Sequence, residues 1–454
     1  MSAEAAKEFD LVVVGTGASG ATVAEACAKE SWRVAIVDER PYGGTCALRG
    51  CDAKKILVRA AELIDWSRRM SGSGIGGAIR IDWTELMRFK RSFTQPVPAE
   101  RERELHDAGV AMYHGAARFV DANTVAVENH RIKARYIVLA TGAVPSTLRL
   151  QGEEHLITSE DFLDLEELPR RIVFIGGGYI AFEFAHLAAR AGAVPVILQR
   201  GPRVLTGFDA TLVDRIVEIG AKVGIDVRVN VDVRGIERTP DGARVTGVAG
   251  GEEFVLECDA AVHAAGRVAD VDRLDLNAGG ITRTKKGIAV NQFFQSCGNA
   301  AVYAVGDCAD GGGLPLTPTA SAEGDLVARN LLDGNRFTLD FCGLASIVYT
   351  IPSLGTTGLT EERARECGLR FEIRESETTQ WYSSRSVCAR GSWYRLLVEV
   401  PSGLLLGANV LGPHTEELIN IFSLAIRAKV PASELKSVLF AYPTGSSDIE
   451  PMLA

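Results

Sequence analysis

Two cysteines lie five positions apart in the stretch "GGTCALRGCDAKK", residues 43–55. Thiols at this spacing can close a small disulfide ring, so Cys46 and Cys51 are candidates for redox chemistry. The apolar residues that follow them recur at helical spacing, which predicts that a helix starts at or near Cys51. Backbone N–H groups and the helix dipole at such a start favour a thiolate, and Cys46 is expected in the preceding loop.

The other cysteines do not form a second close pair. The nine cysteines are scattered along the chain, so neither a disulfide framework nor a zinc ribbon is expected, and no metal site is predicted. Cys27, Cys258 and Cys342 have apolar neighbours in the sequence, which predicts that they are buried.

Composition excludes several classes of protein. The formal net charge is -9 and the sequence pI is about 5.5, which argues against a nucleic-acid partner. No apolar run approaches the roughly 20 residues that span a bilayer, so no membrane association is expected. The N-terminal "MSAEAAKEFD" lacks the basic and apolar regions of a secretory signal. A cytoplasmic protein is therefore predicted.

The first segment that must position the cysteines consists of a strand, a glycine turn, a helix and a second strand. The apolar run 11–14 precedes Gly15, Gly17 and Gly20, and the next strand ends at Asp38. Glycines at this spacing let a pyrophosphate approach the backbone at a helix N-terminus. The acidic residue accepts hydrogen bonds from a ribose. This pattern predicts a dinucleotide site.

The pattern occurs a second time. The strand 172–175 precedes Gly176, Gly178 and Ala181, as G-x-G-x-x-A. Two such units indicate two different dinucleotides. Here the second strand ends at Gln199-Arg200, with Arg203 close behind, instead of at an acid. Arginine can pair with a 2′-phosphate, so NADPH is favoured over NADH. The alternative is that Arg200 is only a solvated loop charge.

The predicted fold class is α/β, with two Rossmann-like dinucleotide-binding domains. From about residue 336 the sequence pattern becomes that of alternating strands followed by helices. This pattern predicts a separate α+β domain at the C-terminus.

Taken together, the chain resembles the flavin- and pyridine-nucleotide-dependent disulfide oxidoreductases, such as glutathione reductase, dihydrolipoamide dehydrogenase and mercuric reductase. The resemblance rests on an ordered set over nearly the whole length: the first fingerprint, "GGTC....GC", "ATG", the second fingerprint with Glu183, "GR" and "GD". It implies an FAD domain in two segments, residues 1–151 and 267–335, an NAD(P)H domain at 152–266, and an interface domain at 336–454 that makes a homodimer.

The resemblance also implies roles for individual residues. The residues expected at FAD are Gly15, Gly17, Gly20, Asp38, Gly44, Thr45, Thr141, Gly142 and Asp307. Those expected at NADPH are Gly176, Gly178, Ala181, Arg200 and Arg203, with Arg267 nearby. Lys54 would pair with Glu183 beside the flavin and stabilise negative charge as hydride arrives.

The implied reaction has two halves. NADPH gives hydride to the flavin, and the reduced flavin passes electrons to the Cys46–Cys51 disulfide. Cys51 would be the thiol against the flavin, and Cys46 would attack the oxidised substrate. The alternative, two unconnected buried thiols, is disfavoured because the pair lies between two dinucleotide fingerprints.

The C-terminal segment departs from the pattern. Members that reduce disulfides carry "HPT..E", whose histidine protonates the leaving thiol in the partner subunit's site. Here the segment reads "AYPTGSSDIEPM", with Tyr442 at the histidine position, Ser447 at the glutamate position and Asp448 next to it. His414 is expected in a surface turn. The proton donor stays open among Tyr442, Asp448 and His414.

Two further departures concern the cysteines and the substrate. Asp52 places a carboxylate next to Cys51 and should oppose thiolate formation. Glu25 stands where glutathione reductases have an arginine that meets glutathione. We therefore expect an oxidised substrate other than glutathione disulfide: another disulfide, a quinone, a metal ion or another electrophile. The alternatives are a flavin quinone reductase or oxidase, a mercuric-reductase-like enzyme, and a redox-sensing flavoprotein without steady-state turnover.

Overall fold

The computed structural model describes residues 6–454, which form two compact units. The first contains the chain up to Lys54, then Arg88–Thr147 and Gly266–Asp340. The second contains Lys55–Met87, Leu148–Ala265 and the chain from Phe341 onward. Each unit is described by itself.

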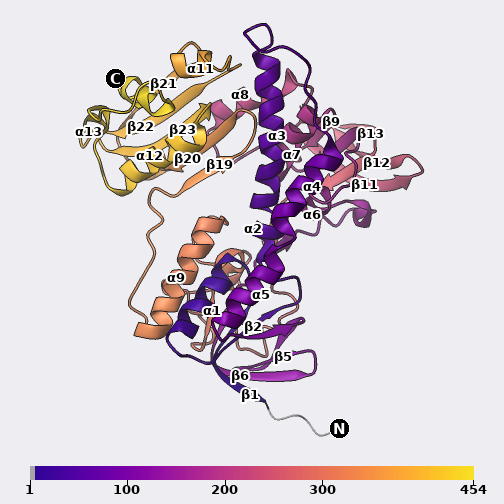
Figure 1. Cartoon of the computed structure of the whole chain (residues 1–454), viewed down its shortest axis with the longest axis vertical. Coiled ribbons are helices and arrows are strands. Elements are labelled where there is room, and N and C mark those ends of the chain that lie inside the picture. The colour runs from indigo at the N-terminus through magenta and orange to yellow at the C-terminus, as the bar shows by residue number, and fades with distance from the viewer. Residues whose placement is uncertain (1–5) are drawn as a thin grey trace. The chain divides into compact units, whose positions relative to one another are not determined.

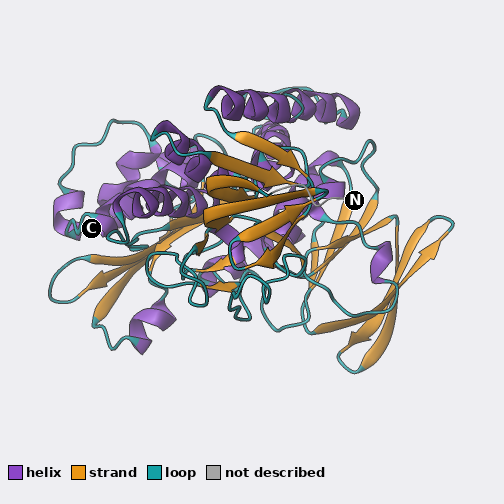
Figure 2. Ribbon diagram, turned by 90° about the horizontal axis from the view of Figure 1, so that it is seen from below, coloured by secondary structure: helices purple, strands orange, loops and turns teal. Residues whose placement is uncertain are grey.

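The first unit is built on a mostly parallel sheet (Figure 1, Figure 2). Its parallel strands are β1 (Lys7–Val14), β2 (Val34–Asp38), β3 (Ala111–His114), β6 (His130–Leu139) and β17 (Val302–Ala304), in the order β3-β2-β1-β6 with β17 also on β6. Antiparallel strands β4 (Ala117–Asp121) and β5 (Thr124–Val127) extend it. The predicted strand 11–14 is confirmed, and its residues are buried because a parallel sheet is covered on both faces.

Helices cover this sheet and carry the site. The helix α1 (Ala18–Lys29) joins β1 to β2, and α9 (Thr317–Asp333) packs beside it (Figure 1). The short α2 (Gly44–Arg49) leads into α3 (Cys51–Arg69), which continues into the second unit. The other helices are α4 (Trp83–Thr94), also shared with the second unit, and α5 (Val97–Asp107). The remaining elements are β7 (Ala143–Pro145), β15 (Arg267–Ala269), β16 (Ile288–Ala289), η2 (Gly306–Cys308) and β18 (Ala309–Asp310).

The second unit begins with a smaller parallel sheet. Its strands are β8 (Arg171–Ile175), β9 (Val194–Leu198), β10 (Asp226–Arg228) and β14 (Ala260–His263), in the order β10-β9-β8-β14. The associated helices are η1 (Glu153–His155), α6 (Ser159–Phe162), α7 (Tyr179–Ala191) and α8 (Ala210–Ala221). An antiparallel sheet follows, β11 (Val231–Thr239), β12 (Gly242–Ala249) and β13 (Glu252–Cys258). The second strand–glycine–helix–strand pattern is thus confirmed.

The C-terminal part of the second unit is a five-stranded antiparallel sheet (Figure 1). Its order is β19 (Ala345–Val348), β20 (Ser353–Gly358), β23 (Leu405–Gly412), β22 (Trp393–Glu399) and β21 (Phe371–Glu377). The helix α12 (Thr415–Arg427) packs on β20 and β23 and buries Leu418, Ile419 and Phe422. Shorter helices are α10 (Glu361–Glu366), α11 (Tyr382–Arg385), α13 (Ala432–Lys436), η3 (Gly445–Asp448) and α14 (Ile449–Met452). The predicted α/β class with a C-terminal α+β part is confirmed.

The cysteines outside the redox pair divide by burial. Cys27 and Cys258 are buried as predicted, and burial raises the pKa of Cys27 to about 12 and that of Cys258 to about 11. Both therefore remain thiols at neutral pH. The prediction for Cys342 is wrong, because this residue is exposed. It lies between the last helix of the first unit and β19, so its apolar neighbours in the sequence do not form a core around it.

Two sequence predictions concern the whole chain. The division at residues 151, 266 and 335 stays a prediction. No helix among residues 6–454 is long and apolar enough to cross a membrane.

Candidate functional site

Cys51 is the first residue of α3, which confirms the predicted helix start. The prediction that Cys46 lies in a loop is wrong, because it belongs to the short helix α2. Gly43 and Gly44 have φ values of 125° and 73°, which turn the chain sharply before α2. The six residues of α2 are enough for more than one helical turn, and Gly50 separates α2 from α3.

Thr317 connects the two sulfur atoms. Its hydroxyl donates a hydrogen bond to Cys46 Sγ at 3.0 Å and lies 3.7 Å from Cys51 Sγ. Thr317 is the first residue of α9, 271 positions from Cys46, and sequence reasoning missed it. Pro318 marks the start of this helix and was the available signal, but nothing in the sequence ties that start to the cysteines.

The surroundings of the pair hold the proton on Cys46. The hydrogen bond with Cys51, then burial, raises the pKa of the Cys46 thiol, while the Thr317 hydroxyl opposes this shift. The negative charge of Asp52 also raises the pKa of Cys46, and its predicted effect on Cys51 stays a prediction.

The first glycine turn has the shape of a dinucleotide cradle. A Cβ on Gly15 would lie 2.2 Å from the Ala140 oxygen, and one on Gly20 would lie 2.1 Å from the Gly15 oxygen. A Cβ on Gly44 would lie 2.4 Å from Cα of Gly17, so the start of α2 touches the turn. Only glycine fits these contacts, as a close-packed phosphate loop requires.

Polar groups next to this cradle suit a cofactor. Thr141 Oγ1 is buried without a hydrogen-bond partner among the described residues, and such an atom is costly unless a ligand satisfies it. Gly142 follows, and a Cβ added to it would meet nothing within 4 Å. Asp38 ends β2 and accepts hydrogen bonds from the Thr16 N–H and hydroxyl, at 2.8 and 2.7 Å, which ties the acid to the glycine turn. These residues fit FAD, and their contacts with it stay predictions, as does the expected role of Thr45.

A second group of carboxylates lies near the end of β17. The Gly306 N–H donates to Glu323 Oε2 at 2.6 Å, next to Asp307. Burial raises the pKa of Glu323 to about 7, and it also raises the pKa of Asp307, which Arg267 opposes. Sequence reasoning missed Glu323. Arg267 lies in the first unit, so the structure places it beside Asp307, and its expected role near NADPH stays a prediction.

The second glycine turn has a similar cradle. A Cβ on Gly176 would lie 2.3 Å from the Ala264 oxygen, Gly178 is the N-cap of α7, and Ala181 is buried on that helix. Gln199 takes the position of the usual acid. Its Oε1 accepts from the Gly177 N–H at 2.9 Å, and its Nε2 donates to the Arg203 carbonyl at 3.2 Å.

The two arginines next to this turn carry charge that no carboxylate neutralises. Arg200 and Arg203 are exposed and form no ion pair with any described residue. An anion approaching the turn would find both guanidinium groups available.

The structure gives the position of Lys54 and of Glu183 within their own units, and does not test the predicted pair. Lys54 lies one turn into α3. Glu183 is buried on α7 and accepts a hydrogen bond from the Tyr349 N–H at 2.9 Å. The two residues belong to different units, so their pairing stays a prediction.

The C-terminal segment presents a tyrosine to solvent. Tyr442 is 78% exposed, and its ring centroid lies 6.2 Å from that of Tyr382. Ser447 caps η3 with Thr444, so it does not orient Tyr442. Asp448 accepts from the Ser383 hydroxyl; burial raises the pKa of Asp448, and Ser383 and His414 oppose this. His414 is exposed in a turn before α12, as predicted. The proton donor stays open.

Glu25, the other predicted departure, has a clear structural partner. Arg101 of α5 donates to its carboxylate at 2.9 Å. The acid is therefore held in place on α1 and gives this position a charge opposite to that of the arginine expected for glutathione.

Comparison with known proteins gives the same assignment. Residues 9–324 match the family described as pyridine nucleotide-disulphide oxidoreductase, and residues 344–453 match its dimerisation domain. A glutathione reductase from Burkholderia cepacia is 31% identical, with 96% of each chain covered. A dihydrolipoyl dehydrogenase from Bacillus subtilis (strain 168) is 29% identical, covering 96% of this chain and 94% of the relative. A mercuric reductase from Lysinibacillus sphaericus is 28% identical, covering 96% and 80%.

Solved structures agree with these relatives. The HOCl-induced flavoprotein disulfide reductase RclA from Escherichia coli, solved as a Cu(II) complex, superposes with a TM-score of 0.88. It is 25% identical, and 98% of this chain and 99% of that chain are covered. The chain thus belongs to the pyridine nucleotide-disulphide oxidoreductase family, flavoprotein enzymes that use FAD and NAD(P)H, and Cys46–Cys51 is its redox-active pair.

Proposed function

We propose that this enzyme uses NADPH to reduce an oxidised acceptor other than glutathione disulfide, through the Cys46–Cys51 pair. The observation that carries the proposal is the position of the two sulfur atoms. Both contact the hydroxyl of Thr317, in the unit that also holds the first dinucleotide turn. FAD, when bound in that unit, supplies the step between two-electron hydride transfer and thiol chemistry.

Cys46 and Cys51 have different roles in the proposed reaction. The hydrogen bond with Cys51 and burial raise the pKa of Cys46, so Cys46 holds its proton. Cys51 is the first residue of α3, where the helix dipole favours a thiolate. For Cys46 to attack an acceptor, its proton must leave, and Thr317 lowers the cost by hydrogen bonding to its sulfur. Oxidation of the Cys46 thiol and the Cys51 thiolate to one disulfide then releases two electrons and one proton.

The surroundings disfavour glutathione disulfide. A leaving thiolate of ordinary pKa needs an acid that can protonate it near neutral pH. Tyr442 occupies the position of the usual histidine, and a phenol is a poor donor there. Glu25 would also repel a glutathione carboxylate. An acceptor with no basic leaving group avoids the first requirement.

A metal ion is the acceptor class that we favour. Mercuric reductase is among the similar proteins, and RclA has been solved as a Cu(II) complex. Thiolates are soft ligands that suit such ions. One dithiol can reduce two Cu(II) to two Cu(I), which balances the two electrons that the pair releases. A quinone or another electrophile is the next class.

The test has two stages. The FAD-loaded protein is titrated anaerobically with NADPH, and a long-wavelength absorption band is expected as the pair is reduced. Steady-state NADPH oxidation is then measured with Cu(II), Hg(II), quinones and disulfides, for the wild type, Cys46→Ser and the double variant Cys46→Ser, Cys51→Ser. Turnover that survives in the double variant indicates a quinone reductase or oxidase, and no turnover with any acceptor indicates a sensor. Efficient, Cys46-dependent reduction of glutathione disulfide would contradict the proposal.

We also propose that Arg200 and Arg203 select NADPH. Replacing both with glutamine should raise the KM for NADPH by about tenfold or more and leave the KM for NADH within about twofold, because only NADPH carries the 2′-phosphate. The control is the variant Arg228→Gln. Arg228 is an exposed arginine whose Nη2 already lies 2.8 Å from Oδ2 of Asp226. Faster flavin reduction by NADH than by NADPH in the wild type contradicts this assignment.

Two broader features complete the proposal. The matched dimerisation domain supports a homodimer. A cytoplasmic location is proposed from the scattered cysteines, since reduced thiols persist there.

A further inference from the structure

The loop that carries Arg200 and Arg203 joins β9 to α8, and it packs against the second glycine turn. The Leu205 N–H donates to the Gly177 carbonyl at 2.8 Å. A Cβ on Gly177 would lie 2.6 Å from Cγ1 of Val204. Val204 and Leu205 are buried, so moving this loop would expose apolar surface to water.

The loop ends at Phe208 and Asp209, where α8 starts. The Phe208 ring centroid lies 5.3 Å from that of Tyr179, the first residue of α7. Asp209 is the N-cap of α8, and its Oδ1 accepts from the Leu212 N–H at 3.2 Å. The other carboxylate oxygen, Oδ2, can therefore accept from a second partner.

That partner is Arg395 on β22, in the C-terminal sheet. Its Nη1 donates to Asp209 Oδ2 at 2.7 Å, its Nη2 to Glu361 Oε2 at 2.5 Å and its Nε to Glu375 Oε2 at 2.6 Å. Each nitrogen of the guanidinium group thus has its own carboxylate, which holds the group in one orientation. The side chains of Arg395 and Asp209 are 12% and 8% exposed, so salt screens their ion pair weakly.

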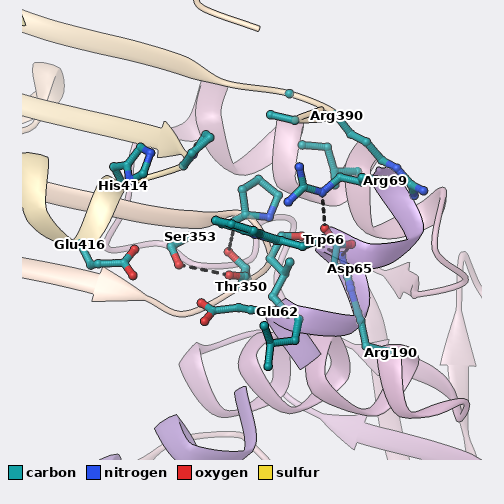
Figure 3. A pocket seen from close by; sticks show the side chains of 18 of the residues that line it. Glu62, Asp65, Trp66, Arg69, Arg190, Thr350, Ser353, Arg390, His414 and Glu416 are labelled. Carbon is teal, nitrogen blue, oxygen red and sulfur yellow. Dashed lines mark hydrogen bonds and ion pairs between the residues drawn. The ribbon is translucent and has the colours of Figure 1, made fainter. Parts of the chain in front are cut away.

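The helix that follows the same glycine turn is held by a different ion cluster. Asp65 on α3 accepts from Arg190 Nη2 of α7 at 3.1 Å and from Arg69 Nε at 2.7 Å (Figure 3). The turn's helix and the loop beside it therefore depend on separate ion pairs. Loss of Arg395 would free the loop and leave the ion pairs of α7 in place.

The charges around Arg395 argue against a direct role in phosphate binding. Arg365 also pairs with Glu361, so two guanidinium groups face three carboxylates. The cluster as a whole is negative and would repel a phosphate. A contribution to phosphate binding must therefore come from holding the loop.

We propose that Arg395 is a positioning residue for coenzyme selection. Through Asp209 it holds the loop in the conformation in which Arg200 and Arg203 meet the 2′-phosphate of NADPH. This inference rests on the proposed selection of NADPH, and it adds that a strand of the C-terminal sheet takes part in that selection.

The test uses the FAD-loaded full chain and isothermal titration calorimetry at one fixed ionic strength. Adenosine 2′,5′-bisphosphate is the probe, and adenosine 5′-monophosphate is its control without the 2′-phosphate. Arg395→Gln should weaken binding of the bisphosphate by about fivefold and that of the monophosphate by less than about twofold. Arg244→Gln should change neither affinity, since Arg244 also bridges two acids, Glu237 and Glu257, but in the sheet of β11 to β13.

A second variant separates positioning from charge. Asp209→Ser keeps an N-cap for α8, removes one negative charge and is too short to reach Arg395. It should weaken binding of the bisphosphate by about fivefold, because the loop is freed. Tighter binding of the bisphosphate would show that the cluster acts through its charge and would overturn the inference. If Arg395→Gln does not fold, Asp209→Ser decides the question.

A double-mutant cycle links Arg395 to the residues that it positions. In the variant Arg200→Gln, Arg203→Gln, adding Arg395→Gln should weaken binding of the bisphosphate no further. Full additivity, equal weakening of both ligands in Arg395→Gln, or unchanged affinity in that variant would overturn the inference.

The same measurements separate this inference from the proposal on which it rests. If Arg200→Gln, Arg203→Gln binds the bisphosphate as tightly as the wild type, the selection of NADPH by these arginines is wrong, and the inference falls with it. If that variant binds it more weakly and Arg395→Gln does not, the role of Arg395 alone is wrong.

Discussion

At the scale of single residues, the hydroxyl of Thr317 tunes the redox pair. It donates to Cys46 Sγ and lowers the pKa of that thiol. Thr317→Val should therefore raise this pKa and shift the pH profile of Cys46 alkylation in the NADPH-reduced enzyme to higher pH. Thr317→Ser keeps the hydroxyl and should resemble the wild type. Arg49 lies between the cysteines, so trypsin separates them and mass spectrometry can follow Cys46 alone. An unchanged profile in Thr317→Val would contradict this role.

Glu323 makes a second prediction at this scale. Its folded pKa of about 7 lies above the unfolded value, so the folded state binds more protons between about pH 4.5 and 7. Stability should therefore fall as pH rises through this window, by up to about 3 kcal/mol for this group. Glu323→Gln keeps an acceptor for the Gly306 N–H and removes the titration.

Urea unfolding of the FAD-saturated protein from pH 5 to pH 8 measures this effect. In Glu323→Gln the fall in unfolding free energy should be smaller, whereas Glu30→Gln, at an exposed position, should match the wild type. Parallel pH dependences in the wild type and Glu323→Gln would show that Glu323 does not titrate in this range.

The sequence predicted the residues that form patterns and missed those that do not. Gly15, Gly176, Cys46 and Cys51 belong to short motifs whose spacing has a physical meaning. Thr317 and Glu323 act through contacts between segments far apart in the chain, and a single sequence does not show which distant segments are in contact. Burial of Cys342 was predicted wrongly for the same reason: apolar neighbours in sequence are not neighbours in space.

At the scale of elements, the contact between α2 and the first glycine turn determines whether the cofactor cradle forms. A Cβ on Gly44 would lie 2.4 Å from Cα of Gly17, with φ at +73°. Gly44→Ala should therefore separate the two elements, and the purified protein should retain much less FAD. Gly109→Ala has nearly the same backbone cost, with φ at +75°, but meets nothing within 4 Å.

The absorbance ratio of flavin to protein measures the occupancy of both variants. Equal FAD content in Gly44→Ala and Gly109→Ala would show that the close contact is not required. The existence and order of these elements followed from the sequence, because strand, glycine and helix signals coincide. The helical state of Cys46 did not, since a six-residue helix has too few positions to show a period.

At the scale of the whole molecule, exposed apolar residues of the C-terminal part support self-association. Leu439 is 99% exposed and Leu424 is 67% exposed, both within the matched dimerisation domain. Burial of such residues by a second copy would be favourable. Leu439→Asp should weaken the dimer, and light scattering after size exclusion should show a lower mass at micromolar concentration.

The control for this prediction lies outside that domain. Val255 is 63% exposed on β13, and Val255→Asp should leave the mass unchanged. A wild-type chain that elutes as a monomer would contradict the homodimer. The sequence predicted the fold class, but the exposure of Leu439 required the structure, because its apolar stretch reads equally well as core.

The contact between Thr317 and Cys46 also has a consequence for biosynthesis. The ribosome adds Cys46 271 positions, and Cys51 266 positions, before it adds Thr317, whose hydroxyl contacts both sulfur atoms. For most of translation the nascent chain therefore carries two adjacent thiols without the group that tunes them. A product truncated before α9 would keep both cysteines of the motif and yet lack the hydroxyl that lowers the pKa of Cys46.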